Sequence, residues 1–134
     1  MKRILLFLLT ICAGLSAQEP MRYTVRFPQP HTHYLEVTAQ APAGAPEVEF
    51  SMAVWTPGSY LVREYSRFVE DFRARDAQGR ALRWEKTRKN RWKVYAGGAP
   101  SVEVSYRVYA REMSVQGNWV DAGFAMLNGA PTFI

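Results

Sequence analysis

The chain has 134 residues, of which 48% are hydrophobic and 22% charged, a balance that fits a single globular domain. Its formal net charge is +5, which falls to +3 if a leader containing Lys2 and Arg3 is removed. This mild charge argues against a nucleic-acid partner. The one cysteine, Cys12, lies in the same leader, which excludes disulfides and thiol catalysis from the mature chain.

Residues 1–17 have the pattern of a helical Sec-type signal peptide. A basic start is followed by an apolar run that is shorter than the roughly 20 residues needed to span a bilayer. The small residue Ala17 predicts cleavage after it, hence an exported protein, periplasmic or secreted, without a stable membrane anchor. Lipid attachment at Cys12 is the weaker alternative, because the bulky Ile11 precedes it where a small residue is expected.

From residue 22 onward, apolar and polar residues alternate with a period of two. Short segments rich in proline, glycine and asparagine separate these runs. The predicted strands and hairpins cover residues 22–27, 33–39, 47–54, 75–84, 85–94 and 101–111. This pattern predicts one all-β domain over 18–134, an antiparallel β-sandwich of two packed sheets.

The segment after residue 59 shows two patterns at once. Leu61, Tyr65, Phe68 and Phe72 recur at helical spacing, whereas residues 67–77 also alternate. A short helix near 60–65 that leads into a strand satisfies both patterns.

The segment from Trp55 to Arg63 combines a turn with large side chains. Pro57 fixes φ near −65° and Gly58 accepts positive φ, so residues 56–59 suit a type II turn. Trp55 and Tyr60 flank this turn. Arg63 lies one helical turn beyond Tyr60, so its guanidinium could emerge beside the phenol.

Two readings of this segment stay open. In the first, its aromatic residues plug one end of the sandwich; in the second, they form a rim that contacts a partner domain or a ligand. Ser59 lacks the G-x-S-x-G setting of a hydrolase nucleophile, so it is predicted to be a turn or cap residue.

No metal site or catalytic group is predicted from the remaining residues. His31 and His33 would face one side of a strand, but the chain offers no further histidine as a third ligand. His33 shares its face with apolar residues and is predicted to be a core histidine. Glu64, Glu70 and Asp71 match no glycosidase spacing and are assigned to surface charge.

Residues 83–93 mix cations with Trp84 and Trp92. On a hairpin, both rings are predicted to face the core while the cations face water. Three other aromatic residues fall off the apolar side of the alternation and could stack on a sugar: Tyr34, Tyr109 and Trp119.

The string "VWTPGSYLVREYSRFV" and the later "EKTRKNRWKV" and "VEVSYRVYA" resemble the N-terminal domain of the glycyl aminopeptidase family. Members are zinc metallopeptidases that usually carry a PDZ domain toward the C-terminus. The resemblance runs from about Tyr23 to Ile134. Its most specific part is Pro-Gly-Ser-Tyr-x-x-Arg at positions 57–63.

The resemblance implies a β-sandwich that precedes a catalytic domain holding zinc on a His-Glu-x-x-His helix and releasing N-terminal glycine or alanine. The chain has no such motif and no histidine after His33, so no catalytic residue can be transferred to it. We therefore expect an inactive N-terminal domain, truncated at its C-terminal end, with zinc in the catalytic domain.

The partners that the resemblance implies are the parent enzyme's own downstream catalytic domain, which this domain would dock on and flank, and a peptide substrate. The candidate interface or substrate-rim residues are Trp55, Pro57, Gly58, Ser59, Tyr60 and Arg63. The alternative is a free-standing periplasmic or surface module that binds carbohydrate or protein. A small complete enzyme that uses scattered carboxylates ranks below both.

Overall fold

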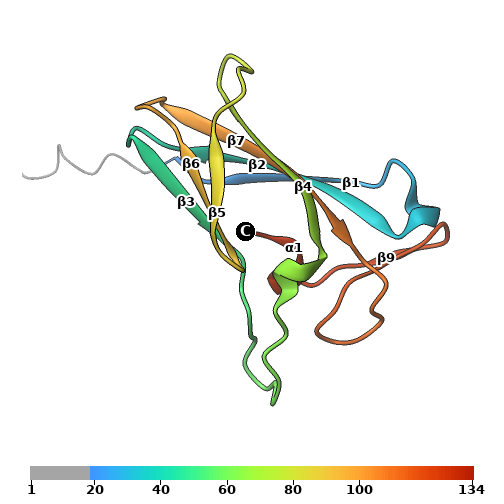
Figure 1. Ribbon diagram of the computed structural model, residues 1–134. Coiled ribbons are helices and arrows are strands. Elements are labelled where there is room, and N and C mark those ends of the chain that lie inside the picture. The colour runs from blue at the N-terminus through green and yellow to red at the C-terminus, as the bar shows by residue number, and fades with distance from the viewer. Residues whose placement is uncertain (1–18) are drawn as a thin grey trace, which may run out of the picture.

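The computed structural model describes residues 19–134, so the predicted signal peptide lies outside the described residues (Figure 1). β-strands are the main secondary structure of this part of the chain, as the alternation predicted. The strands are β1 (Arg22–Arg26), β2 (Tyr34–Pro42), β3 (Glu47–Ser51), β4 (Val69–Asp76), β5 (Trp84–Arg88), β6 (Arg91–Tyr95), β7 (Ser101–Tyr109), β8 (Trp119–Val120) and β9 (Ala125–Met126). The helical turns are η2 (Pro30–Thr32), η3 (Tyr65–Phe68) and α1 (Gly129–Thr132).

The larger sheet has four antiparallel strands in the order β1-β2-β7-β4. Its centre is the β2–β7 pair, in which Leu35 lies opposite Val108 and Val37 opposite Tyr106. Buried and more exposed residues alternate along both strands, so one face of the sheet is apolar and the other polar. This is the pattern expected of an antiparallel sheet with one covered face.

The smaller sheet has three antiparallel strands in the order β3-β6-β5. Its register places Phe50 opposite Trp92 and Val48 opposite Val94. The outer side chains are charged, and Glu47 and Glu49 pair with Lys93 and Arg91 across β3 and β6. These exposed pairs add little free energy each, so the sheet is held mainly by its inner face.

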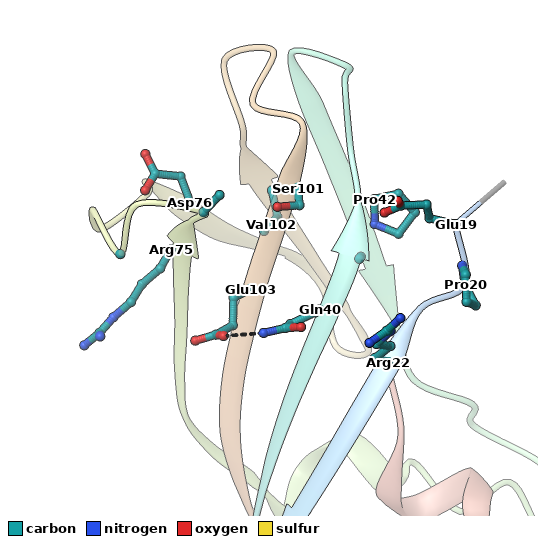
Figure 2. A pocket seen from close by; sticks show the side chains of 13 residues that line it. Glu19, Pro20, Arg22, Gln40, Pro42, Arg75, Asp76, Ser101, Val102 and Glu103 are labelled. Atoms are coloured by element: carbon teal, nitrogen blue, oxygen red, sulfur yellow. Dashed lines mark hydrogen bonds between the residues drawn. The ribbon is translucent and has the colours of Figure 1, made fainter.

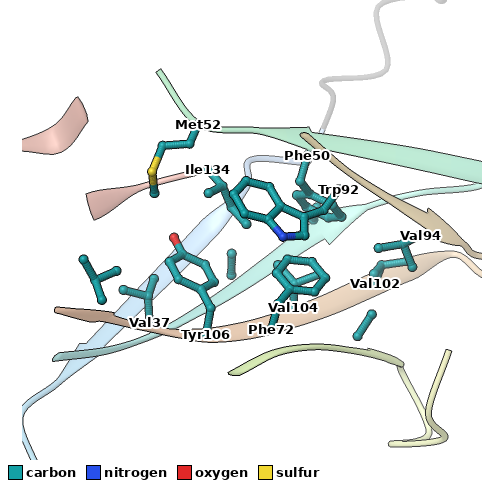
Figure 3. Close-up of a cluster of buried hydrophobic side chains, with 14 of the residues drawn as sticks. Val37, Phe50, Met52, Phe72, Trp92, Val94, Val102, Val104, Tyr106 and Ile134 are labelled. Atoms are coloured by element: carbon teal, nitrogen blue, oxygen red, sulfur yellow. The ribbon is translucent and has the colours of Figure 1, made fainter. Parts of the chain in front are cut away.

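The two sheets share one core between their apolar faces (Figure 3). Phe72 of the larger sheet stacks on Trp92 of the smaller one, with ring centroids 5.5 Å apart and planes 11° apart. Trp92 is 2% exposed, and truncating an aromatic side chain this deeply buried costs about 3–5 kcal/mol. The expected antiparallel β-sandwich is therefore confirmed.

The sandwich is a wedge rather than two parallel layers. In Figure 1 the sheets converge where the β2–β3 and β6–β7 connections meet, and they diverge toward the opposite end. Backbone hydrogen bonds join the two connections, for example from Ala43 N to Pro100 O and from Gly97 N to Pro46 O. At the open end, α1 and the buried Ile134 fill the space between the sheets.

Asn118 holds the segment that fills the open end. It is 3% exposed, and its amide donates to Pro131 O and to Thr132 Oγ1 while its Oδ1 accepts from Asn128 N. Tyr106 donates its hydroxyl to Thr132 O at 2.9 Å, and burial raises the pKa of this phenol. The turn at residues 128–132 is thus fixed to β7 by buried polar contacts.

The short helical turn lies a few residues later than expected. It covers Tyr65–Phe68, whereas residues 60–64 are not helical. Glu64 adopts a left-handed conformation (φ 48°), and Arg63 N bonds back to Val54 O instead of entering a helix. The helical spacing of Leu61, Tyr65 and Phe68 therefore reflects a loop followed by one 3-10 turn.

The alternation misplaced some residues near strand ends. His33 has φ 64° and ends η2, so it precedes β2 rather than sharing the core face of Leu35. Trp84 does face inward and contacts Phe72, but it lies at the sheet edge and is 39% exposed. Lys86 shares the inner side and lies over Trp92, with its Nζ 5.0 Å from the ring centroid.

Candidate functional site

The loop of residues 52–64 is built around the tight turn that the sequence predicted. Ser59 N donates to Thr56 O at 3.1 Å, which closes the turn. Gly58 has φ +85°, the positive value that a type II turn requires at its third residue. Pro57 precedes it with its φ already restricted, so these two residues determine where the chain reverses.

Side chains within the loop hold its tip in one conformation. Trp55 donates from Nε1 to Ser59 O at 2.7 Å, and the Ser59 hydroxyl donates to Leu61 O at 2.9 Å. Ser59 is thus a turn residue, as predicted. The side chain of Tyr60 lies fully in solvent, with a relative exposure of 110%.

Arg63 joins this loop to a second one. Its Nη1 donates to Glu112 Oε1 at 3.1 Å and its Nη2 to Gln116 Oε1 at 2.6 Å. The side chain is only 26% exposed. Because residues 60–64 are not helical, Arg63 does not emerge beside the Tyr60 phenol; its guanidinium is engaged within the domain.

Large apolar side chains are exposed on these two joined loops. We call them the apolar loop surface, formed by Trp55, Tyr60, Leu61, Val62, Met113 and Val115, with relative exposures of 47% to 110%. In Figure 1 the two loops extend from the open end of the wedge. Solvent exposure of this many large apolar side chains on adjoining loops is typical of a surface that another protein surface covers.

Charge is absent from the same two segments. Neither residues 53–62 nor residues 113–118 contain a charged side chain, whereas 22% of the whole chain is charged. Arg63, Glu64, Arg111 and Glu112 flank them. Depletion of charge at the centre with charged residues at the rim is the composition of a protein–protein interface.

The histidines and carboxylates considered in the sequence do not assemble into a reactive site. His31 is exposed, and the ring of His33 contacts Val120 O through Nδ1 at 2.6 Å. Glu70 and Asp71 both pair with Arg107. Within residues 19–134, no group of three or more His, Cys, Asp or Glu is placed to hold a metal ion.

A polar groove of about 540 Å³ lies at the opposite end of the larger sheet (Figure 2). Gln40 donates to Glu103 across it at 3.1 Å. Asp76 accepts hydrogen bonds from the backbone of Gln78 and from the backbone and side chain of Arg80. Burial by itself would raise the pKa of Asp76, but the hydrogen bonds outweigh this effect and lower the pKa below its ordinary value. The carboxylate therefore stabilises the β4–β5 turn.

The three aromatic residues considered for sugar binding contact their neighbours. Tyr34 and Tyr109 pack together with ring centroids 5.2 Å apart, and Tyr34 donates to Glu70 at 3.0 Å. Trp119 donates from Nε1 to Asp121 Oδ2 at 2.8 Å. Their arrangement is that of packed side chains rather than of an open stacking platform.

Comparison with known protein families identifies the family to which this chain belongs. The family model of the peptidase M61 N-terminal domain matches residues 22–134, which includes every described strand. The chain belongs to this family. The candidate loops of this M61 N-terminal domain, 52–64 and 111–118, both lie inside the match.

A solved structure agrees with the assignment. The M61 N-terminal domain is similar to an aminopeptidase N family protein from Idiomarina loihiensis, with 29% sequence identity and a TM-score of 0.71. The alignment covers 76% of this chain but only 17% of that protein. The chain thus corresponds to a small part of that much longer protein. No curated protein matches the chain.

The structure also adds residues to the site that the sequence reading missed. Leu61, Val62, Met113 and Val115 were not among the candidates, although the uncharged composition of residues 113–118 is a signal that could have indicated the second loop. The link from Arg63 to Glu112 had no such signal, because it joins residues 49 positions apart.

Proposed function

We propose that this M61 N-terminal domain is the non-catalytic domain of an exported zinc metalloaminopeptidase, and that it docks on and flanks the catalytic domain of the same protein. The parent enzyme would release N-terminal glycine or alanine from peptides. The observation that carries the docking role is the apolar loop surface, which is exposed, uncharged and braced by Arg63. Family membership supports the link to a peptidase.

Zinc would belong to the other part of the enzyme. The two histidines of this chain are unsuited to it, because His31 is exposed on η2 and His33 is held to the Val120 carbonyl. The described residues bring no third ligand beside them. We therefore assign no step of peptide hydrolysis to residues of this domain.

Export is proposed from the leader pattern of residues 1–17 alone. Within residues 19–134, the structure contains no helix with the length and apolar character needed to cross a bilayer. Cleavage after Ala17 is checked by mass spectrometry of the protein recovered from the periplasm or the medium.

The experiment that tests the enzymatic part compares this chain with the longer parent protein that the proposal implies. Both are purified with zinc and assayed on glycyl and alanyl chromogenic substrates. We expect hydrolysis by the longer protein, loss of that hydrolysis with a chelator, and no hydrolysis by the 134-residue chain. Activity of the short chain alone would contradict the proposal, and so would a longer protein that stays inactive with zinc.

A further inference from the structure

The smaller sheet covers only part of the larger one, because three strands face four. β5 and β6 lie over β4, since Trp84 and Trp92 both pack on Phe72, with ring centroids 4.9 Å and 5.5 Å away. β4 is at one edge of the order β1-β2-β7-β4, and β1 is at the other. The third strand, β3, therefore lies toward the β1 side, and no further strand of its sheet covers β1 within residues 19–134.

The inner face of β1 is accordingly open in part. Tyr23 lies opposite Ala39 of β2, so it points to the same side as the core residues of that strand. Its ring packs on Phe133 with centroids 4.7 Å apart, yet the residue is 36% exposed. Leu35 and Val37 on the inner face of β2 are fully buried. An apolar part of the sheet face is thus left uncovered beside the end of the smaller sheet.

β3 has a free backbone edge on the same side. Among the described strands it pairs only with β6, and Met52 N bonds to Asn90 O just beyond the pair. In an antiparallel ladder, every second residue directs its N–H and C=O away from the partner strand. By this register, Glu49 and Ser51 direct theirs to the free edge. Such an edge is a template on which another strand can pair.

Ile134 lies in the gap between β1 and the smaller sheet. Its side chain is 8% exposed and belongs to the shared core with Phe50 and Met52 (Figure 3). Its carbonyl accepts a hydrogen bond from the Tyr23 hydroxyl of β1. A residue that follows Ile134 therefore starts between the uncovered face of β1 and the sheet that contains β3.

We propose that the residues following Ile134 in the parent protein form a fourth strand of the smaller sheet, paired with the free edge of β3 and covering Tyr23. The inference rests on the proposed function, which supplies a longer parent chain. The solved neighbour also is much longer than the aligned part, which is 17% of it. About ten to fifteen residues suffice, since β3 has 5 residues and a strand rises about 3.3 Å per residue.

Pairing with β3 accounts for the uncovered face, whereas pairing with β1 does not. β1 is an edge strand too. A strand added to it would lie in the same layer, so it would leave the inner side of Tyr23 as exposed as before. A strand added to β3 lies in the opposite layer, about 10 Å away, where its side chains can pack on the inner face of β1.

The test is amide hydrogen exchange in β3, measured in the 134-residue chain and in the same chain extended by about twenty residues of the parent sequence, enough for one strand and its connection. We expect the amides of Glu49 and Ser51 to exchange at least about tenfold more slowly in the extended chain, because a paired amide exchanges only when the strand opens. The amides of Val48 and Phe50 are the matched control. They point to β6 in both chains, so their exchange should change much less.

The other occupants give different results. Unchanged exchange at Glu49 and Ser51 in the extended chain, with slower exchange only in the complete parent protein, would overturn the proposal, because a distant part would then cover the edge. Slower exchange in the 134-residue chain at high concentration, lost on dilution, would overturn it as well, since the edge would then pair with a second copy.

Tyr23→Ala tests the covered face. The substitution should lower the urea midpoint of both chains, because the ring packs on Phe133 in each. The decrease should be larger in the extended chain, where the added strand buries the rest of the ring. Thr24→Ala, on the opposite face of β1, is the control and should act alike in both chains. Equal decreases for Tyr23→Ala would contradict the proposed cover.

The two proposals can fail separately. A complete parent protein without aminopeptidase activity contradicts the proposed function, whereas slower exchange at Glu49 and Ser51 in the extended chain still supports the added strand. Unchanged exchange in the extended chain of an active enzyme contradicts the added strand alone.

Discussion

At the scale of single residues, Arg63 bonds to other residues of the same domain. Its guanidinium joins the 52–64 loop to Glu112 and Gln116, and its backbone amide closes the loop on Val54 O. The string Pro-Gly-Ser-Tyr-x-x-Arg therefore contains the turn at Pro57 and Gly58, the exposed ring of Tyr60, and Arg63, which braces the loop against the 111–118 segment. Arg63 holds the loop in place, and the loop in turn exposes the Tyr60 ring to solvent.

Arg63→Ala should destabilise the 134-residue chain. The substitution removes the hydrogen bonds that Arg63 donates to Glu112 and Gln116, so we expect the free energy of unfolding in urea to fall by about 1–2 kcal/mol. The control is Arg26→Ala on the exposed edge strand β1, which should change it by less than about 0.5 kcal/mol. Equal effects of the two substitutions would show that Arg63 is no brace.

At the scale of elements, the strands follow from the alternation of side chains, whereas the loops follow from individual turn residues. β2 and β7 lie within three residues of the predicted runs, and β5 and β6 form the hairpin predicted over 85–94. β3 is shorter than its run, because the chain leaves the sheet after Ser51 and Met52 N bonds to Asn90 O in the β5–β6 turn. The helix predicted near 60–65 has the wrong bounds. The hydrogen bond from Arg63 N to Val54 O closes a loop there, and this bond outweighs the helical spacing of the apolar residues.

Gly58→Ala tests the turn as an element. A Cβ at this position would meet no atom within 4 Å, so the cost comes only from the backbone at φ +85°. We expect about 1–2 kcal/mol of destabilisation by urea unfolding, the penalty for a side chain in the left-handed region. Gly58→Asn should recover part of the loss, because asparagine tolerates that region. Alanine and asparagine variants of equal stability would contradict this account.

At the scale of the whole molecule, the wedge presents two different ends. The converging end is closed by backbone hydrogen bonds between two turns, and the groove there is polar. The open end is filled by α1 and Ile134 and carries the apolar loop surface. Under the proposed docking role, the open end is therefore the one that the rest of the protein would cover.

Because the apolar loop surface is exposed, we expect the 134-residue chain to self-associate at high concentration. The double substitution Leu61→Ser and Val115→Ser should reduce this association. Both side chains are exposed, by 60% and 89%, so the free energy of unfolding should change by less than about 0.5 kcal/mol. Sedimentation velocity at increasing concentration should show less oligomer than for the unchanged chain. Phe27→Ser, an exposed aromatic outside this surface, is the control and should leave association as it was. If Phe27→Ser reduces association as much, the apolar loop surface has no special role.

The sequence by itself determined the fold class and the turn of the site. Period-two alternation follows from the geometry of a strand, and Pro57 and Gly58 restrict the backbone locally. The strands and the turn can therefore be predicted without knowledge of contacts between distant residues. The tertiary structure alone decided which side chains are free. It paired Arg63 with Glu112, left the Tyr65 hydroxyl buried without a partner, and brought Val115 to the same end as Tyr60. These outcomes depend on which loops meet when the two sheets pack, and local spacing carries no information about contacts 49 positions apart.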